Sequence, residues 1–191
     1  MDKKINSFKL GFVLLIITAL TGLILGTIYT VTKGPIQAQM IKTNNDAMKE
    51  IITKADTFEK INTKLKGNVT EVNAAKKGSE TIGYTIKLTS KGYGGNIEIM
   101  VGISAKDEIE GIKILSQSET PGLGANSENP SFYGQYKSKS IKKDLNVVKT
   151  KPSNENEIQA ITGATITSKA VTHGVNEAVQ YYKDNLKGGN N

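Results

Sequence analysis

The 191-residue chain contains no cysteine, no tryptophan and no arginine, and its single histidine is His173. The lack of cysteine excludes disulfides, thiolate metal sites, a cysteine nucleophile and iron–sulfur clusters held in the usual way. A single histidine argues against histidine-based metal sites and catalytic triads. These absences exclude cysteine-based chemistry and argue against histidine-based chemistry.

All of the positive charge is lysine, and the formal net charge is +7. Surfaces that bind nucleic acid usually rely on arginine for bidentate contacts to bases and phosphates. We therefore attribute the charge to solubility and membrane-side bias, and we expect no nucleic-acid partner. With 37% hydrophobic and 23% charged residues, the chain can form a packed core. Its length predicts one ordinary domain plus an appendage.

An uncharged run from Leu10 to Val31 predicts a membrane span. At 1.5 Å per residue it reaches roughly 33 Å, enough to cross the hydrocarbon core in contact with lipid. A cleaved signal peptide is the alternative, but the run exceeds the usual apolar core of such peptides. Lys3, Lys4 and Lys9 precede the run, and only Lys33 follows it at once. The positive-inside rule therefore places the N-terminus in the cytoplasm and the rest of the chain outside.

After the span, Gly34-Pro35 is expected to break the helix or bend its exit. Residues 36–66 have apolar points at helical spacing and predict a further helical stretch, with a break near Asp56. Alternating apolar and polar residues then predict three successive antiparallel strands. These strands cover residues 81–90, 96–104 and 109–116, with a glycine-rich turn at 92–95.

Residues 117–140 form a long loop whose aromatic residues, Phe132, Tyr133 and Tyr136, indicate ordered packing. A helix is predicted from about Lys169 to Leu186, with Thr167 or Ser168 as its N-cap. The fold class is therefore α+β: one transmembrane helix, then an extracytoplasmic domain with an antiparallel sheet and flanking helices. The expected division is a cytoplasmic N-terminus (1–9), a transmembrane helix (10–31), a juxtamembrane helical segment (32–66), the outer domain (67–187) and a loose tail (188–191).

The segment Thr162–Ser168, TGATITS, combines small residues with four hydroxyls directly before the predicted helix. Small residues let a bulky group approach the backbone, and helix N-termini attract phosphate. On these residues alone the segment is either a phosphate site or an ordinary capped loop.

The sequence Thr162-Gly163-Ala164-Thr165 resembles the (S/T)GAT motif that extracytoplasmic flavin transferases modify at its last threonine, here Thr165. A second segment, ETPGLG at residues 119–124, resembles one typical of the same FMN-binding domain. Together with the N-terminal span, these motifs resemble the G subunit of the Rnf ion-translocating electron-transport complex over nearly the whole chain. One position departs from the transferase motif: Gln159 stands where an aspartate is common.

The resemblance implies an electron-relay subunit of an oxidoreductase that passes electrons between ferredoxin and NAD and moves Na⁺ or H⁺. FMN is the implied cofactor, joined through its phosphate to Thr165, and the implied partners are the other subunits of the complex and a flavin transferase. No catalytic residue and no metal is expected. The implied FMN-binding residues are Thr162, Gly163, Ala164, Thr165 and Thr167, with Glu119, Thr120, Pro121, Gly122, Leu123 and Gly124 packing near the ring.

Three alternatives remain open at this point. The related C subunit of the Na⁺-translocating NADH:quinone reductase has the same domain in a generally longer chain. A cofactor-free anchored sensor or binding module has the same architecture without flavin. A stand-alone flavinylated domain feeding an extracellular reductase is the third.

Overall fold

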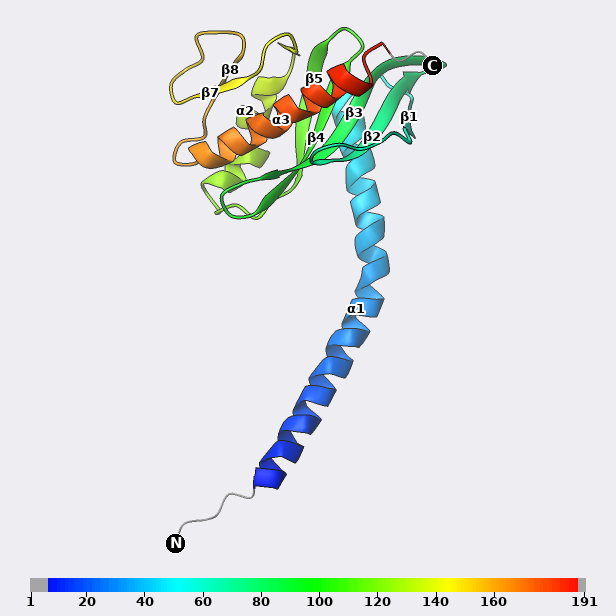
Figure 1. The fold of residues 1–191 in the computed structure, drawn as a ribbon, viewed down its shortest axis with the longest axis vertical. Coiled ribbons are helices and arrows are strands. Elements are labelled where there is room, and N and C mark those ends of the chain that lie inside the picture. The colour runs from blue at the N-terminus through cyan, green and yellow to red at the C-terminus, as the bar shows by residue number, and fades with distance from the viewer. Residues whose placement is uncertain (1–6, 189–191) are drawn as a thin grey trace. The chain divides into compact units, whose positions relative to one another are not determined.

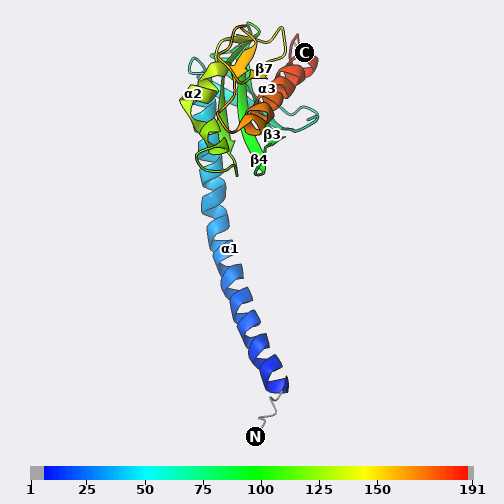
Figure 2. The ribbon, with the colours of Figure 1, turned by 90° about the vertical axis from the view of Figure 1, so that its left-hand side faces the viewer.

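The computed structural model describes residues 7–188 (Figures 1 and 2). The chain divides into two compact units, residues 1–43 and 44–191. Of the expected features, Lys3, Lys4 and most of the tail lie outside the described residues. The long helix α1 (Ser7–Ile51) supplies the described part of the first unit, and its last turns belong to the second.

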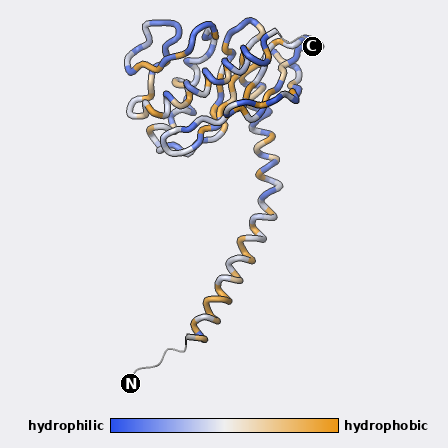
Figure 3. Tube along the Cα trace, in the orientation of Figure 1, coloured by the Kyte–Doolittle hydropathy of each residue, from blue (hydrophilic) through white to orange (hydrophobic). Residues whose placement is uncertain are grey.

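In the first unit, α1 has the length and composition of a membrane-crossing helix. Hydrophobic residues dominate the N-terminal part of α1 (Figure 3), and their side chains are exposed. Threonine hydroxyls within it donate hydrogen bonds to carbonyls of the preceding turn, for example Thr18 to Leu14 and Thr21 to Ile17. The polar groups of the helix are thus satisfied internally, as a hydrocarbon environment requires.

Gly34-Pro35 does not break the helix, because α1 continues through Pro35 to Ile51. The other expectation, a bend at the exit of the span, stays a prediction. A proline removes one backbone hydrogen bond, and the bonds of the neighbouring turns can carry the helix past that position. The expected helix over 36–66 is also wrong beyond Ile51. Residues 57–60 are instead the strand β1 (Thr57–Lys60), and residues 61–66 have no regular structure.

The second unit is built on a six-stranded antiparallel sheet in which each strand pairs with its neighbour in the chain. The three predicted strands are confirmed as β3 (Glu80–Lys91), β4 (Asn96–Ser104) and β5 (Glu108–Ser116). The strand β2 (Val69–Lys77) pairs with β1 and β3, and β6 (Lys139–Ser140) pairs with β5. The α+β class with an antiparallel sheet is confirmed.

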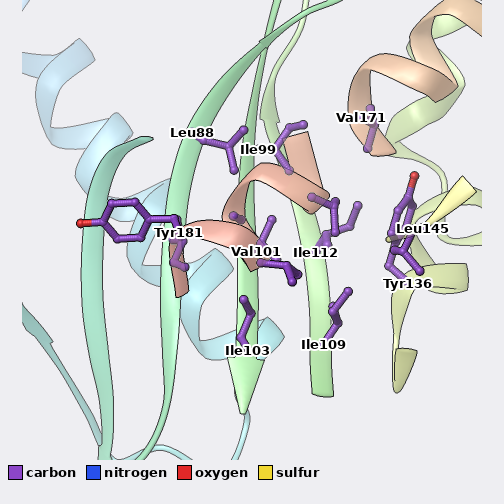
Figure 4. Close-up of a cluster of buried hydrophobic side chains, with 14 of the residues drawn as sticks. Leu88, Ile99, Val101, Ile103, Ile109, Ile112, Tyr136, Leu145, Val171 and Tyr181 are labelled. Carbon is purple, nitrogen blue, oxygen red and sulfur yellow. The ribbon is translucent and has the colours of Figure 1, made fainter. Parts of the chain in front are cut away.

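The helix α3 (Thr165–Asn185) crosses one face of this sheet and forms the main core with it (Figure 4). Its side chains Val171, Val175 and Val179 pack among isoleucine, leucine and valine side chains of β3, β4 and β5. At Gly174 the helix comes so close that an added Cβ would lie 2.9 Å from Leu88 Cδ1. The helix begins four residues before its predicted start, so Thr167 and Ser168 lie in its first turn, and their prediction as N-cap is wrong.

The last turn of α1 covers part of the other face of the sheet. Met48, Ile51 and Ile52 are buried there against Ala75 and Met100. The apolar spacing that predicted a longer helix therefore reflects burial. Beyond Ile51 the chain forms a turn and the strand β1, and Ile52 and Phe58 pack in the same cluster without a helix.

Between β5 and α3 the chain forms a lobe of short elements. They are the 3-10 helices η1 (Gly124–Glu128) and η2 (Gly134–Tyr136), the helix α2 (Pro130–Tyr133), and the parallel pair β7 (Asn146–Val148) and β8 (Glu157–Gln159). The expected ordering by aromatics is confirmed for Phe132 and Tyr136, which are buried and meet edge to face at 5.8 Å. Burial raises the pKa of Tyr136, whose hydroxyl is hydrogen-bonded to Thr172 on α3.

Candidate functional site

A groove of about 430 Å³ lies at the N-terminal end of α3, and we call it the Thr165 groove. Three segments form it: the turn between β3 and β4, the loop after β5, and the start of α3. Its size falls within the range of small-molecule and cofactor sites. The lining residues are Tyr93, Glu119, Thr120, Leu123, Gly124, Gly163, Ala164, Thr165, Ile166 and Thr167.

The structure brings most of the predicted FMN-binding residues into this groove. Of the predicted set, Gly122 and Thr162 line an adjoining groove instead, and Pro121 is exposed. The adjoining groove also contains Gln159, the position that departs from the transferase motif. The side-chain amide of Gln135 holds the backbone of Gln159 on both sides, since Gln159 N donates to Gln135 Oε1 and Gln135 Nε2 donates to Gln159 O.

Thr165 is the first residue of α3, and in the described part of the chain this helix has no side-chain cap. The first N–H groups of a helix have no partner within the helix, and they carry the positive end of its dipole. An uncapped N-terminus of this kind can bind a phosphate group. The half-buried Thr165 side chain therefore lies beside donors suited to a phosphate.

The four hydroxyls of the segment have different environments. Thr167 is buried and donates to Glu119 Oε2 at 2.5 Å. Ser168 is buried too; its hydroxyl donates to Ala164 O and accepts from Ile161 N. Among residues 7–188, the hydroxyls of Thr162 and Thr165 have no hydrogen-bond partner. Two of the four hydroxyls are thus committed to holding the loop, and two are available for chemistry.

The ETPGLG segment makes a tight turn that presents Leu123 to the groove. Leu123 N donates to Thr120 O at 3.1 Å, with Pro121 and Gly122 at the two central positions and a φ of +75° at Gly122. Proline followed by a glycine of positive φ is the pattern of a type II turn. Leu123 then reaches the opposite wall, where a Cβ on Gly163 would lie 2.9 Å from its Cδ2.

Glu119 joins the three walls of the groove. It is 6% exposed, and besides the bond from Thr167 its Oε1 accepts from Gly94 N at 2.9 Å. A Cβ on Gly124 would lie 2.5 Å from Glu119 Oε2 and 2.6 Å from Thr167 Oγ1, so glycine is required for this packing. Because both of its oxygens are taken by the protein's own donors, Glu119 serves as a brace beneath the groove.

The rim of the groove gathers exposed apolar side chains. Over residues 44–188, only four large hydrophobic side chains are exposed: Leu65 (44%), Tyr93 (72%), Leu123 (43%) and Ile166 (57%). Three of these four line the Thr165 groove, each from a different wall. Exposed apolar groups gathered at one place indicate a binding surface. The arrangement suits a flat, mostly uncharged ring held above a phosphate.

Sequence reasoning missed two of these residues, Tyr93 and Ile166. An aromatic residue among three glycines, Gly92-Tyr93-Gly94-Gly95, was one available signal. For Ile166 the signal was an apolar residue directly after Thr165. It was missed because the helix was predicted to begin only at about Lys169, so Ile166 was not expected to lie on it. Among the described residues, no group of three or more histidine or acidic side chains could hold a metal ion.

Comparison with known proteins agrees with this geometry. Residues 92–180 match the FMN-binding domain family, and this range holds all three walls of the groove. The chain is 45% identical to the G subunit of the proton-translocating ferredoxin:NAD(+) oxidoreductase complex of Clostridium ljungdahlii, with 94% of both chains covered. It is 40% identical to the G subunit of the Na(+)-translocating complex of Acetobacterium woodii, covering 93% of this chain and 92% of that one.

Among solved structures, the C subunit of the Na(+)-translocating NADH-quinone reductase from Parabacteroides distasonis is similar. It has a TM-score of 0.55 and 25% identity, and the match covers 68% of this chain and 76% of that one. The higher identity and fuller coverage of the G subunits decide between the two families. The chain therefore belongs to the G-subunit family of ion-translocating ferredoxin:NAD(+) oxidoreductase complexes.

Proposed function

We propose that this chain is the membrane-anchored electron-relay subunit of a ferredoxin:NAD(+) oxidoreductase complex that moves Na⁺ or H⁺, and that it carries FMN on Thr165. The observation that carries the proposal is the Thr165 groove. It joins a free hydroxyl, an uncapped helix N-terminus and three exposed apolar side chains within the FMN-binding domain match. The residues fit both ends of FMN, its phosphate and its ring.

Each residue has a separate role in this proposal. Thr165 Oγ1 would hold the phosphate of FMN as an ester, and the first N–H groups of α3 would stabilise the remaining negative charge. Leu123 and Ile166 would contact the ring and exclude water from it. Bound FMN supplies the redox chemistry, because it accepts and releases electrons singly or in pairs. Glu119 and Thr167 hold the walls at a fixed spacing.

Covalent attachment suits a domain outside the cytoplasm, where a released cofactor is lost. The tether keeps the local concentration of flavin high at the groove. We place the domain outside because lysines precede the apolar helix, as the positive-inside rule requires. The partners are then the other subunits of the complex, the surrounding lipid, and a flavin transferase that acts on the exposed segment around Thr165.

The free hydroxyl of Thr162 is the main competitor for attachment, so the test separates the two. Full-length protein is produced together with a flavin transferase and then denatured on a gel. Thr165→Val should abolish flavin fluorescence, whereas Thr162→Val should retain it. Peptide mass spectrometry should place the added mass on Thr165. Wild-type protein without covalent flavin, or fluorescence that survives Thr165→Val, would contradict the proposal and favour a cofactor-free binding module.

A further inference from the structure

The turn between β3 and β4 forms one wall of the Thr165 groove and carries a single side chain. It consists of Gly92, Tyr93, Gly94 and Gly95, and Gly92 N donates to Gly95 O at 2.8 Å. Lys91 and Asn96 pair directly below it, so the turn closes a regular hairpin. Tyr93 is therefore the only residue through which this wall can offer side-chain contacts.

The glycines of the turn are required for space. A Cβ on Gly92 would overlap Glu119 Oε1, and one on Gly94 would overlap the carbonyl oxygen of Ser118. Within residues 7–188, the glycines of positive φ lie elsewhere, so conformational freedom is not the reason for glycine here. The turn is pressed onto the Ser118–Glu119 backbone and is held there by the bond from Gly94 N to Glu119. The position of Tyr93 at the rim is thereby fixed.

The side chain of Tyr93 is 72% exposed, the largest exposed fraction among the large apolar residues of the second unit. It is also the only aromatic side chain that lines the groove; the other exposed apolar groups there, Leu123 and Ile166, are aliphatic. Aromatic rings gain most from offset or edge contacts with another ring. A flat heteroaromatic ligand entering the groove meets aliphatic groups on two walls and an aromatic ring on the third.

We infer that Tyr93 contacts the isoalloxazine ring of FMN and shields one side of it from water, with Glu119 as the positioning residue that holds the turn. The inference rests on the proposed function and extends it to a residue outside the two sequence motifs. An electron-rich phenol in contact with a flavin quenches flavin fluorescence, whereas any side chain of similar size blocks access of solutes. The two effects can be separated by substitution.

The experiment uses full-length flavinylated protein in detergent. Flavin emission of the native protein is divided by the emission of the same sample after denaturation, which corrects for the extent of attachment. Access to the ring is measured by iodide quenching. Tyr93→Leu should raise the emission ratio severalfold and increase iodide quenching. Tyr93→Phe should also raise the ratio, because the phenol is lost, but it should leave iodide quenching near the wild-type value.

Leu65→Ala is the matched control, since Leu65 is exposed but does not line the groove. It should leave both readouts unchanged. If both Tyr93 variants match the wild type in both readouts, the contact is refuted while the flavin assignment stands. If wild-type protein acquires no covalent flavin, the proposed function fails, and this contact fails with it.

Discussion

Replacing either of the two threonines in the first turn of α3, Thr165 or Thr167, by valine should change a different property of the protein. Valine replaces a threonine hydroxyl by a methyl group at nearly constant volume, and the helix propensities of the two residues are similar. Thr167→Val removes the 2.5 Å hydrogen bond to the buried Glu119. Thr165→Val removes a hydroxyl that has no partner among residues 7–188. One substitution should therefore affect stability, and the other should affect only the chemistry.

The cost at Thr167 can be worked from its partner. A hydrogen bond to a charged group contributes about 1.5–3 kcal/mol, and its loss leaves a carboxylate oxygen buried without a donor. For a protein of this size, each kcal/mol lowers Tm by about 2–4 °C, so the loss of about 1.5–3 kcal/mol predicts a drop of roughly 3–12 °C. At Thr165 the change in the free energy of unfolding should stay within about 0.5 kcal/mol.

Full-length protein is produced in a host without flavin transferase, so that no cofactor contributes. Its thermal unfolding is then followed by circular dichroism. Covalent flavin is then measured separately by in-gel fluorescence after production with the transferase. Thr167→Val should melt early yet still become flavinylated below its Tm; Thr165→Val should melt like the wild type and carry no flavin. Unchanged melting of Thr167→Val would refute the bracing role of Glu119.

Three further predictions follow from the described contacts. Gly124→Ala should lower the free energy of unfolding by about 1–3 kcal/mol, because the added Cβ would crowd Glu119 and Thr167. Gly134→Ala is the control, since the space around its Cβ is open, and it should not destabilise the protein. Chemical denaturation of the two variants measures the difference. The side-chain amide of Asn154, together with three hydrogen bonds from Ser153 N, Ser153 Oγ and Asn154 N, lowers the pKa of Glu157 from 4.5 to about 2. A depressed carboxyl pKa stabilises the fold above the unfolded value, so this contribution should be lost as pH falls from 4.5 towards 2, and Glu157→Gln should reduce the pH dependence of unfolding in that window. Protease added to wall-free cells should digest the domain after α1, and protection until lysis would contradict the outward orientation.

Regular alternation made the centre of the sheet predictable. In β3, β4 and β5, isoleucine, leucine and valine alternate with polar residues or form a continuous apolar run. The strand β2 was missed because its buried positions include Asn73, Ala74 and Ala75, which weaken the contrast that defines a strand. The strand β1 was missed because its four residues, Thr57–Lys60, are mostly exposed and depend on pairing with β2.

The groove was predictable from its motifs only in part. The segments at 119–124 and 162–167 were recognised, but their meeting depends on the Glu119–Thr167 hydrogen bond across 48 positions of sequence. The third wall depends on the fit of two glycines against Ser118 and Glu119, and no local pattern reports such a fit. The predicted cap was wrong for a related reason. Because the hydroxyls of Thr167 and Ser168 bind tertiary and loop partners, the helix extends back to Thr165.

The uncapped start of α3 has a consequence for maturation. A phosphodiester that joins Thr165 to the flavin keeps a negative charge beside the free N–H groups, where such a charge contributes about 0.3–1 kcal/mol. The modified residue would thus complete the helix that spans the domain core. If FMN is attached at Thr165 as proposed, the flavinylated domain would be more stable than its precursor by about this amount.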